Sequence, residues 1–399
     1  MGEKSWFFSY NKAGIINKDD WIGDNAMPNM DILNLEERFE QLKDETNKED
    51  LLLLVKEFKR NHFPNVLTKS AEYRKKYRDQ KQLVNLLLLL EAVCHAQIGE
   101  YKQSSAILQT LYAKAEGMTG SELVTYGELA FMSDYKLARK ILSDAVRRME
   151  AEAEADRIKL ARGYLVLGEA EEKLEKFTRA IKYYKQGLTY FQEDDIRDKY
   201  MILYLHFKIG MLYSAKNEHE EAIDYLEKAV ELAGENFEMK INSLVSLAKI
   251  YGSKSENEKA YPYLQESLSL LEESSLSESF IHAEALIEMA FYHFDQAKLD
   301  EAAPYYQRAI NLYKKLPGRD NRKVGMVYMQ YAYCLEHKKK ADKHQAGVSY
   351  EKAIEQLEKT KDRELLENAY ADVIAFFDAT NNTKKKRMYE NKFVKMVNG

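Results

Sequence analysis

Residues 218–229 read Glu-His-Glu-Glu-Ala-Ile-Asp-Tyr-Leu-Glu-Lys-Ala, and residues 299–309 repeat that order as Leu-Asp-Glu-Ala-Ala-Pro-Tyr-Tyr-Gln-Arg-Ala. An earlier version stands at residues 176–187, as Lys-Phe-Thr-Arg-Ala-Ile-Lys-Tyr-Tyr-Lys-Gln-Gly. A phrase that recurs at a long, regular interval is typical of a solenoid, because each unit buries its apolar face only against its neighbours. The sequence therefore predicts an elongated array whose concave surface carries the function.

The phrase has a fixed order of small and large side chains. Its opening small residue recurs at intervals of 38 to 44 residues, at Ala138, Ala180, Ala222, Ala260, Ala302 and Ala346. A large residue follows four positions later, at Leu142, Tyr184, Leu226, Leu264, Tyr306 and Tyr350, and a small residue three positions after that. Steps of four and then three place all three side chains on one face of a helix. Each unit therefore packs this helix closely against a neighbour.

A second mark stands twelve residues before the opening small residue, where an apolar residue precedes Gly168, Gly210, Ala248 and Ala290. This mark predicts a first helix in every unit. The combined pattern resembles tetratricopeptide repeats over about residues 82–358, although the units exceed the usual 34 residues and lack the usual tryptophan. The resemblance implies an all-α fold: a right-handed superhelical solenoid of long helix pairs whose first helices line a concave groove.

Composition agrees with long helices and limits the function. Of 399 residues, 45% are hydrophobic and 31% charged, with only 17 glycines and 5 prolines. The net charge of −5 disfavours a general nucleic-acid binder. Two distant cysteines, Cys94 and Cys334, predict neither a disulfide framework nor a metal cluster. With no visible signal peptide or membrane-length apolar run, we expect a cytoplasmic protein without cofactor, metal or membrane contact.

The first 80 residues do not follow the period, and they predict a separate domain, 1–80. Residues 4–27 are expected to be irregular or to form short helices. Helices are expected at 32–44, 48–61 and 67–77, the last two separated by Pro64, which interrupts helical hydrogen bonding. These helices predict a small bundle that packs on the array.

The array is predicted to occupy residues 81–399. Its last two helices, at 363–380 and 384–397, are expected to cap it. The basic runs at 338–340 and 384–387 are interpreted as solvated charge.

No catalytic motif is found in the sequence. It contains no phosphate-binding glycine loop, no nucleophile elbow and no His-Glu-x-x-His pair. The eight histidines are scattered over different units, so no metal-ligand set is predicted.

In tetratricopeptide arrays the groove is lined by first-helix positions that flank the Gly or Ala mark. Rings, a flexible methionine, opposite charges and amides stand there, a mixture that suits an extended peptide. An alternative role for each of these side chains is packing between units. The predicted peptide-binding groove consists of Arg162, Glu169, Tyr204, Phe207, Met211, Asn242, Lys249, Phe291 and Gln330.

A bundle in front of long repeats resembles the Rap-type regulators of Gram-positive bacteria, which belong to a group of receptors for re-imported signalling peptides. Residues 50–62, Asp-Leu-Leu-Leu-Leu-Val-Lys-Glu-Phe-Lys-Arg-Asn-His, are similar to the second bundle helix of Rap proteins. The resemblance implies that the bundle contacts a response regulator or transcription factor, and that a peptide in the groove alters it. The expected partner-binding residues are Asn47, Glu49, Asp50, Lys56 and Lys59.

Three functions stay open at this point. The leading hypothesis is a non-enzymatic, peptide-controlled regulator. The first alternative is a response-regulator aspartyl-phosphate phosphatase, since some Rap proteins position water with a bundle glutamine. Here the matching turn, residues 46–50, has no glutamine, and Gln41 is only nearby. The second alternative is a static scaffold or co-chaperone. A homodimer is also left open.

Overall fold

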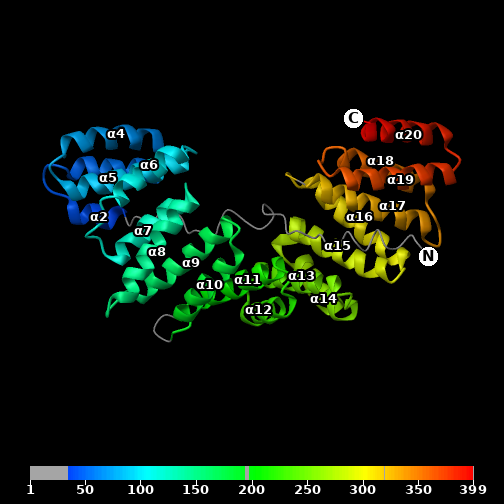
Figure 1. Cartoon of the computed structure of the whole chain (residues 1–399), viewed down its shortest axis with the longest axis horizontal. Coiled ribbons are helices and arrows are strands. Elements are labelled where there is room, and N and C mark those ends of the chain that lie inside the picture. The colour runs from blue at the N-terminus through cyan, green and yellow to red at the C-terminus, as the bar shows by residue number, and fades with distance from the viewer. Residues whose placement is uncertain (1–34, 194–196, 319, 399) are drawn as a thin grey trace. The chain divides into compact units, whose positions relative to one another are not determined.

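The computed structural model describes residues 35–193, 197–318 and 320–398. This part of the chain contains nineteen α-helices, one short 3-10 helix and no strand, which confirms the all-α fold class (Figure 1). Residues 4–27 lie outside the described residues. The α-helices are α2 (Leu35–Leu42), α3 (Lys48–Lys59), α4 (Phe63–Lys76), α5 (Lys81–Gln97), α6 (Tyr101–Tyr112), α7 (Gly120–Phe131), α8 (Tyr135–Ala151), α9 (Arg157–Lys173), α10 (Phe177–Phe191), α11 (Lys199–Ala215), α12 (His219–Leu232), α13 (Phe237–Ser253), α14 (Asn257–Glu273), α15 (Phe280–Asp295), α16 (Leu299–Lys315), α17 (Asn321–His337), α18 (Lys343–Leu357), α19 (Arg363–Ala379) and α20 (Thr383–Asn398).

The described helices form two compact units, which we call the N-terminal unit and the C-terminal unit. The first contains α2–α11 and ends at Glu218, and the second contains α12–α20 and begins at His219. The predicted domain boundary at residue 80 falls inside the N-terminal unit, where α4 packs on α5. The division into 1–80 and 81–399 stays a prediction.

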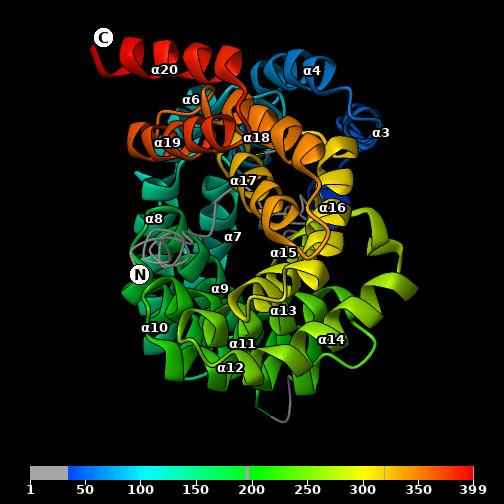
Figure 2. The same ribbon diagram turned by 90° about the vertical axis from the view of Figure 1, so that its right-hand side faces the viewer.

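Within each unit, helices pack in successive pairs. α7 pairs with α8 and α9 with α10, while α13 pairs with α14, α15 with α16 and α17 with α18. Figure 2 shows the stacked pairs of the C-terminal unit from α13 to α18. The second helix of each pair carries the phrase found in the sequence. Its opening alanines are at most 3% exposed and its large residues, from Leu142 to Tyr350, are equally buried, as predicted.

The close approach of the two helices depends on the small first-helix residue. At Gly168 in α9, an added Cβ would lie 2.5 Å from Cδ1 and 2.6 Å from Cε1 of Tyr184 in α10. Both distances are far inside van der Waals contact, so only glycine lets this ring lie flat against the first helix. The glycine mark is therefore a packing requirement within the pair.

Burying tyrosine as the large residue creates a second requirement, a partner for its hydroxyl group. The Tyr184 hydroxyl donates to Glu172 at 2.6 Å and the Tyr350 hydroxyl to Glu336 at 2.9 Å. Both carboxylates stand at the same place near the end of the first helix. In α15 that place is occupied by Phe294, and the buried Tyr306 hydroxyl has no hydrogen-bond partner among the described residues.

The three N-terminal helices differ in one respect from the prediction. The third, α4, begins at Phe63 rather than at residue 67, because Pro64 stands in its first turn instead of in a linker. The first helical turn has no internal acceptor for its N–H groups, so proline costs nothing there and its fixed φ favours the helix.

Two matched substitutions test the requirement for a hydroxyl partner. Tyr184→Phe should lower the local free energy of unfolding by about 1–2 kcal/mol, because it removes a buried hydrogen bond to a carboxylate. Tyr306→Phe should leave it unchanged or raise it by about 1 kcal/mol, because it removes an unsatisfied hydroxyl. Hydrogen exchange of α10 and α16 measures each effect in its own unit. Equal losses in both variants would contradict this account.

Candidate functional site

Polar contacts join successive first helices of the N-terminal unit. Arg162 Nη2 in α9 lies 2.9 Å from Oε1 of Glu128 in α7. The Tyr204 hydroxyl in α11 donates to Oε1 of Glu169 in α9, also at 2.9 Å. Three predicted groove residues therefore link one repeat to the next.

Glu169 lies in a cluster that is short of positive charge. Glu169 is 8% exposed, and Lys208 of α11 forms its ion pair with the neighbouring Glu172 at 2.6 Å. Burial raises the pKa of Glu169 to about 7, against the opposing effects of Lys208 and of the Tyr204 hydrogen bond. This carboxyl group therefore changes charge near neutral pH.

The other two predicted groove residues of this unit are packing residues. Phe207 is 7% exposed and Met211 is 8% exposed, both in α11. Most of their surface is covered by the protein itself, so little of either side chain is left for a ligand.

In the C-terminal unit an ion cluster joins three first helices. Glu284 of α15 accepts from Lys249 of α13 at 2.7 Å and from Lys323 of α17 at 2.8 Å. Burial alone would raise the pKa of Glu284, but the two lysines outweigh it and hold the pKa well below its usual range. Burial raises the pKa of Glu288, one turn further along α15. Lys249 is thus held by a carboxylate of the next repeat.

The remaining predicted groove residues are Asn242 in α13, Phe291 in α15 and Gln330 in α17. All three are half-buried. The Phe291 ring stacks on Phe294 with centroids 6.5 Å apart. The side-chain amides of Asn242 and Gln330 have no hydrogen-bond partner within the ranges that the structure describes. Their donors and acceptors are therefore available for further hydrogen bonds.

Three of the contacts between first helices share one spacing. A side chain of one first helix reaches a residue 34 or 35 positions later, from Glu128 to Arg162, from Glu169 to Tyr204 and from Lys249 to Glu284. We call these three contacts the first-helix ladder. The sequence pattern identified at least one member of each pair but missed Glu128 and Glu284. The signal that could have identified them is an opposite charge at this spacing from Arg162 and from Lys249.

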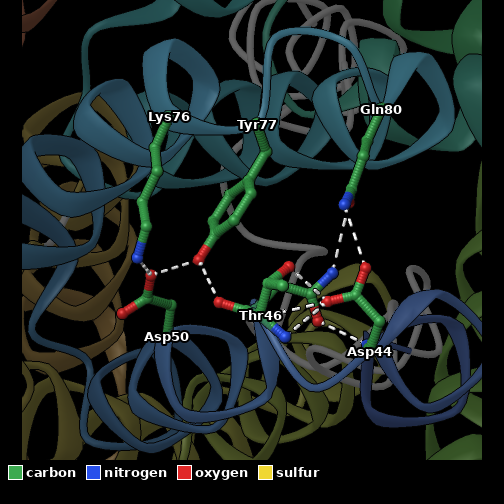
Figure 3. A network of polar contacts seen from close by, with 7 residues as sticks. Asp44, Thr46, Asp50, Lys76, Tyr77 and Gln80 are labelled. Carbon is green, nitrogen blue, oxygen red and sulfur yellow. Dashed lines mark hydrogen bonds and ion pairs between the residues drawn. The ribbon is translucent and has the colours of Figure 1, made fainter.

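A polar network ties the turn between α2 and α3 to the end of α4 (Figure 3). The Asn47 amide donates to the Leu42 carbonyl at 3.1 Å and to Gln80 Oε1 at 3.2 Å, and it accepts from the Asp44 N–H at 2.7 Å. Gln80 Nε2 in turn donates to Asp44 at 3.0 Å. Asn47 is fully buried, so its side chain acts within the bundle.

Asp50 is held by a second part of the network. Its Oδ2 lies 2.8 Å from Lys76 Nζ and 2.5 Å from the Tyr77 hydroxyl, which is also 2.9 Å from the Thr46 carbonyl (Figure 3). Burial works against ionisation of Asp50, but the hydrogen bonds from Lys76 and Tyr77 prevail and lower its pKa. Asp50 therefore fixes α3 to α4 as a carboxylate.

The other predicted partner-binding residues line the outside of α3. Glu49, Lys56 and Lys59 are exposed, and Lys59 pairs with Glu36 of α2 at 2.5 Å. Leu52 of the same helix is 60% exposed. Gln41, the glutamine near the turn, is exposed in α2, and the glutamine that contacts the turn itself is Gln80.

Two features of the described residues bear on what the site can hold. Within residues 35–193, 197–318 and 320–398, no group of three His, Cys, Asp or Glu side chains is arranged to bind a metal ion. Over the same ranges, no helix has the length and apolar character needed to cross a membrane.

Comparison with known families identifies the repeats. Models described as tetratricopeptide repeat match residues 161–194 and 203–236, and another of that description matches residues 282–322. The chain contains tetratricopeptide repeats. The matched segments cover α9–α12 and α15–α16, the helices that carry most of the marks found in the sequence. No curated protein sequence matches the chain with significance.

Solved structures share this fold at low sequence identity. The apo form of RapI superposes with a TM-score of 0.59 at 15% identity, over 89% of this chain and 98% of that chain. The apo form of the quorum sensor NprR from B. thuringiensis gives 0.51 at 15% identity, over 88% and 100%. The tetratricopeptide-repeat sensor ATPase PH0952 from Pyrococcus horikoshii gives 0.57 at 16% identity, over 94% of this chain and 54% of that one.

The buried carboxyl group of Glu169 predicts a pH dependence of stability. Because its pKa is raised by folding, the folded chain binds this proton more tightly than the unfolded chain, and stability falls as pH rises from about 5 to 7. Glu169→Gln keeps an acceptor for Tyr204 and removes this dependence. Relative to wild type, the variant should gain about 2–3 kcal/mol between pH 5 and pH 8.

Thermal unfolding measured across this pH range tests the expectation. Glu116→Gln is the control, because Glu116 is exposed in the same unit and its side chain has no hydrogen-bond or ion-pair partner among the described residues. Parallel pH profiles for wild type and Glu169→Gln would refute the assignment.

Asn47→Ala tests whether the turn is structural. The change leaves the Leu42 carbonyl, the Asp44 N–H and Gln80 Oε1 without the hydrogen bonds that Asn47 makes to them, so the bundle should lose about 2–3 kcal/mol. Glu49→Ala, two positions away and exposed, should change stability by less than about 0.5 kcal/mol. Hydrogen exchange in α2 and α3 reports the loss, and retention of full protection in Asn47→Ala would contradict the burial argument.

Proposed function

We propose that this chain is a regulator that binds a short linear peptide on the first-helix face of its repeats and controls a partner protein through the N-terminal bundle. The carrying observation is the pair of half-buried amides, Asn242 and Gln330, which lie on that face without a hydrogen-bond partner among the described residues. A half-buried amide loses water on one side, and an unpaired one gains most from a new partner. The amides of an extended peptide provide both donors and acceptors for it.

Apolar and charged neighbours complete the proposed site in the C-terminal unit. Phe291, stacked on Phe294, presents a ring for a peptide side chain. Lys249, Glu284 and Lys323 connect α13, α15 and α17, so the helices that carry the amides are fixed to one another. A preformed face of this kind lowers the entropy cost of binding a flexible peptide.

The fold likeness supports this proposal over a static scaffold. RapI and NprR match at least 88% of this chain, and NprR is a quorum sensor. Under this proposal a peptide stabilises one arrangement of the repeats, and the bundle then exposes or withholds its partner surface. The exposed residues Glu49, Lys56 and Lys59 of α3 are the proposed partner contacts.

A peptide-binding experiment tests the proposal. A library of short peptides is screened for those that raise the melting temperature of the full chain, and the affinity of each hit is measured by calorimetry. Asn242→Ala and Gln330→Ala should each weaken binding about fivefold to tenfold, since each removes a hydrogen bond of about 1 kcal/mol. Gln103→Ala, an exposed amide on α6, is the control and should bind as wild type does. The absence of any stabilising peptide would refute the proposal.

A further inference from the structure

Helix α20 presents an outer face whose charged side chains are all positive. Lys384, Arg387, Met388, Asn391, Val394 and Lys395 follow one another at steps that place them on one side of a helix. All six are exposed, and the apolar Met388 and Val394 are 42% and 53% exposed. The face combines three cations with two apolar side chains and contains no carboxylate.

The lysines on the flanks of the same helix behave differently. Lys385 pairs with Glu351 of α18 at 2.9 Å, and Lys386 pairs with Asp378 of α19 at 2.8 Å. Lys392 pairs with Glu358 at 2.8 Å. Lys384, Arg387 and Lys395 have no hydrogen-bond or ion-pair partner among the described residues. The cations that hold α20 in place are thus distinct from those on its outer face.

Packing of α20 does not account for the outer face. Its inner side carries Tyr389, which is 4% exposed and stacks on Phe377 of α19 with ring centroids 5.7 Å apart. Phe393 adds an edge contact to Tyr370. A helix that only closes the array needs a polar outer surface, and exposed Met388 and Val394 add nothing to that role.

We propose that the outer face of α20 binds an acidic amphipathic helix of a protein partner. Carboxylates at steps of three and four residues on that helix would pair with Lys384, Arg387 and Lys395, and its apolar stripe would cover Met388 and Val394. Because the three cations of this face have no counter-charge among the described residues, the partner helix must carry negative charge. This surface is separate from the proposed peptide site.

Two other occupants fit the face less well. In a twofold dimer α20 would pack on α20, because such an interface uses the same patch on both copies. Arg387 and the two lysines would then oppose one another. A membrane-surface helix needs a broad apolar face, but the broad apolar side of α20, with Tyr389 and Phe393, is turned onto α19.

The test uses a synthetic 18-residue helix with glutamates and leucines on one face, labelled for fluorescence anisotropy, and the full chain. The triple change Lys384→Glu, Arg387→Glu and Lys395→Glu should weaken binding at least tenfold. The control is Lys339→Glu, Lys340→Glu and Lys343→Glu, the same charge change at three other exposed lysines of the C-terminal unit, and it should alter binding by less than twofold. Binding should also weaken with added salt.

Three results would overturn the proposal. The first is equal weakening by both triple changes, which indicates general charge attraction. The second is binding to phosphatidylserine vesicles that the α20 triple change abolishes while the acidic helix fails to bind. The third is self-association in sedimentation that the same change abolishes. Asn242→Ala should bind the acidic helix as wild type does, so this proposal and the peptide proposal fail independently.

Discussion

The contact between a large second-helix side chain and a small first-helix residue is the constraint on which the repeats depend. Tyr184 lies so close to Gly168 that a methyl group between them would overlap the ring. Once such a ring is buried, its hydroxyl needs an acceptor, and Glu172 and Glu336 stand where a neighbouring tyrosine needs one. Tyr306 breaks this rule because Phe294 replaces the carboxylate. The packing contact is therefore primary, and the hydrogen bond follows from it.

The same constraint determines what the first helices can present. Since the second helix covers one side of each first helix, polar residues collect on the other side, and many of them pair with the next repeat. The first-helix ladder uses Arg162, Glu169, Tyr204 and Lys249 in this way. Polar residues of this face thus fall into two groups: the ladder residues join the repeats, while Asn242 and Gln330, whose side-chain amides have no hydrogen-bond partner among the described residues, are the proposed ligand contacts.

The sequence alone predicted the helix pairs correctly, but it did not predict which polar residues join the repeats. Steps of four and three residues identify a buried face from the chain alone, so the alanines and large residues of the second helices were predicted correctly. Pairing between Glu128 and Arg162 depends on how two repeats stack, which a single helical pattern does not contain. Asn47 has the sequence of an exposed turn, yet it is fully buried because Gln80, 33 residues later, supplies its partner. Pro64 was assigned to a linker although it suits a first turn equally well.

The ladder also bears on the chemistry of a ligand. A peptide that relied on charge would have to compete with ion pairs already formed, such as Lys249 with Glu284, and would leave one partner buried without its counter-charge. A peptide that relied on backbone hydrogen bonds and apolar side chains meets unpaired amides and a stacked ring, and it disrupts nothing. Recognition on this face should therefore depend more on backbone shape and apolar contact than on net charge. The proposed site on the outer face of α20 differs, because its three cations would bind a partner mainly through charge.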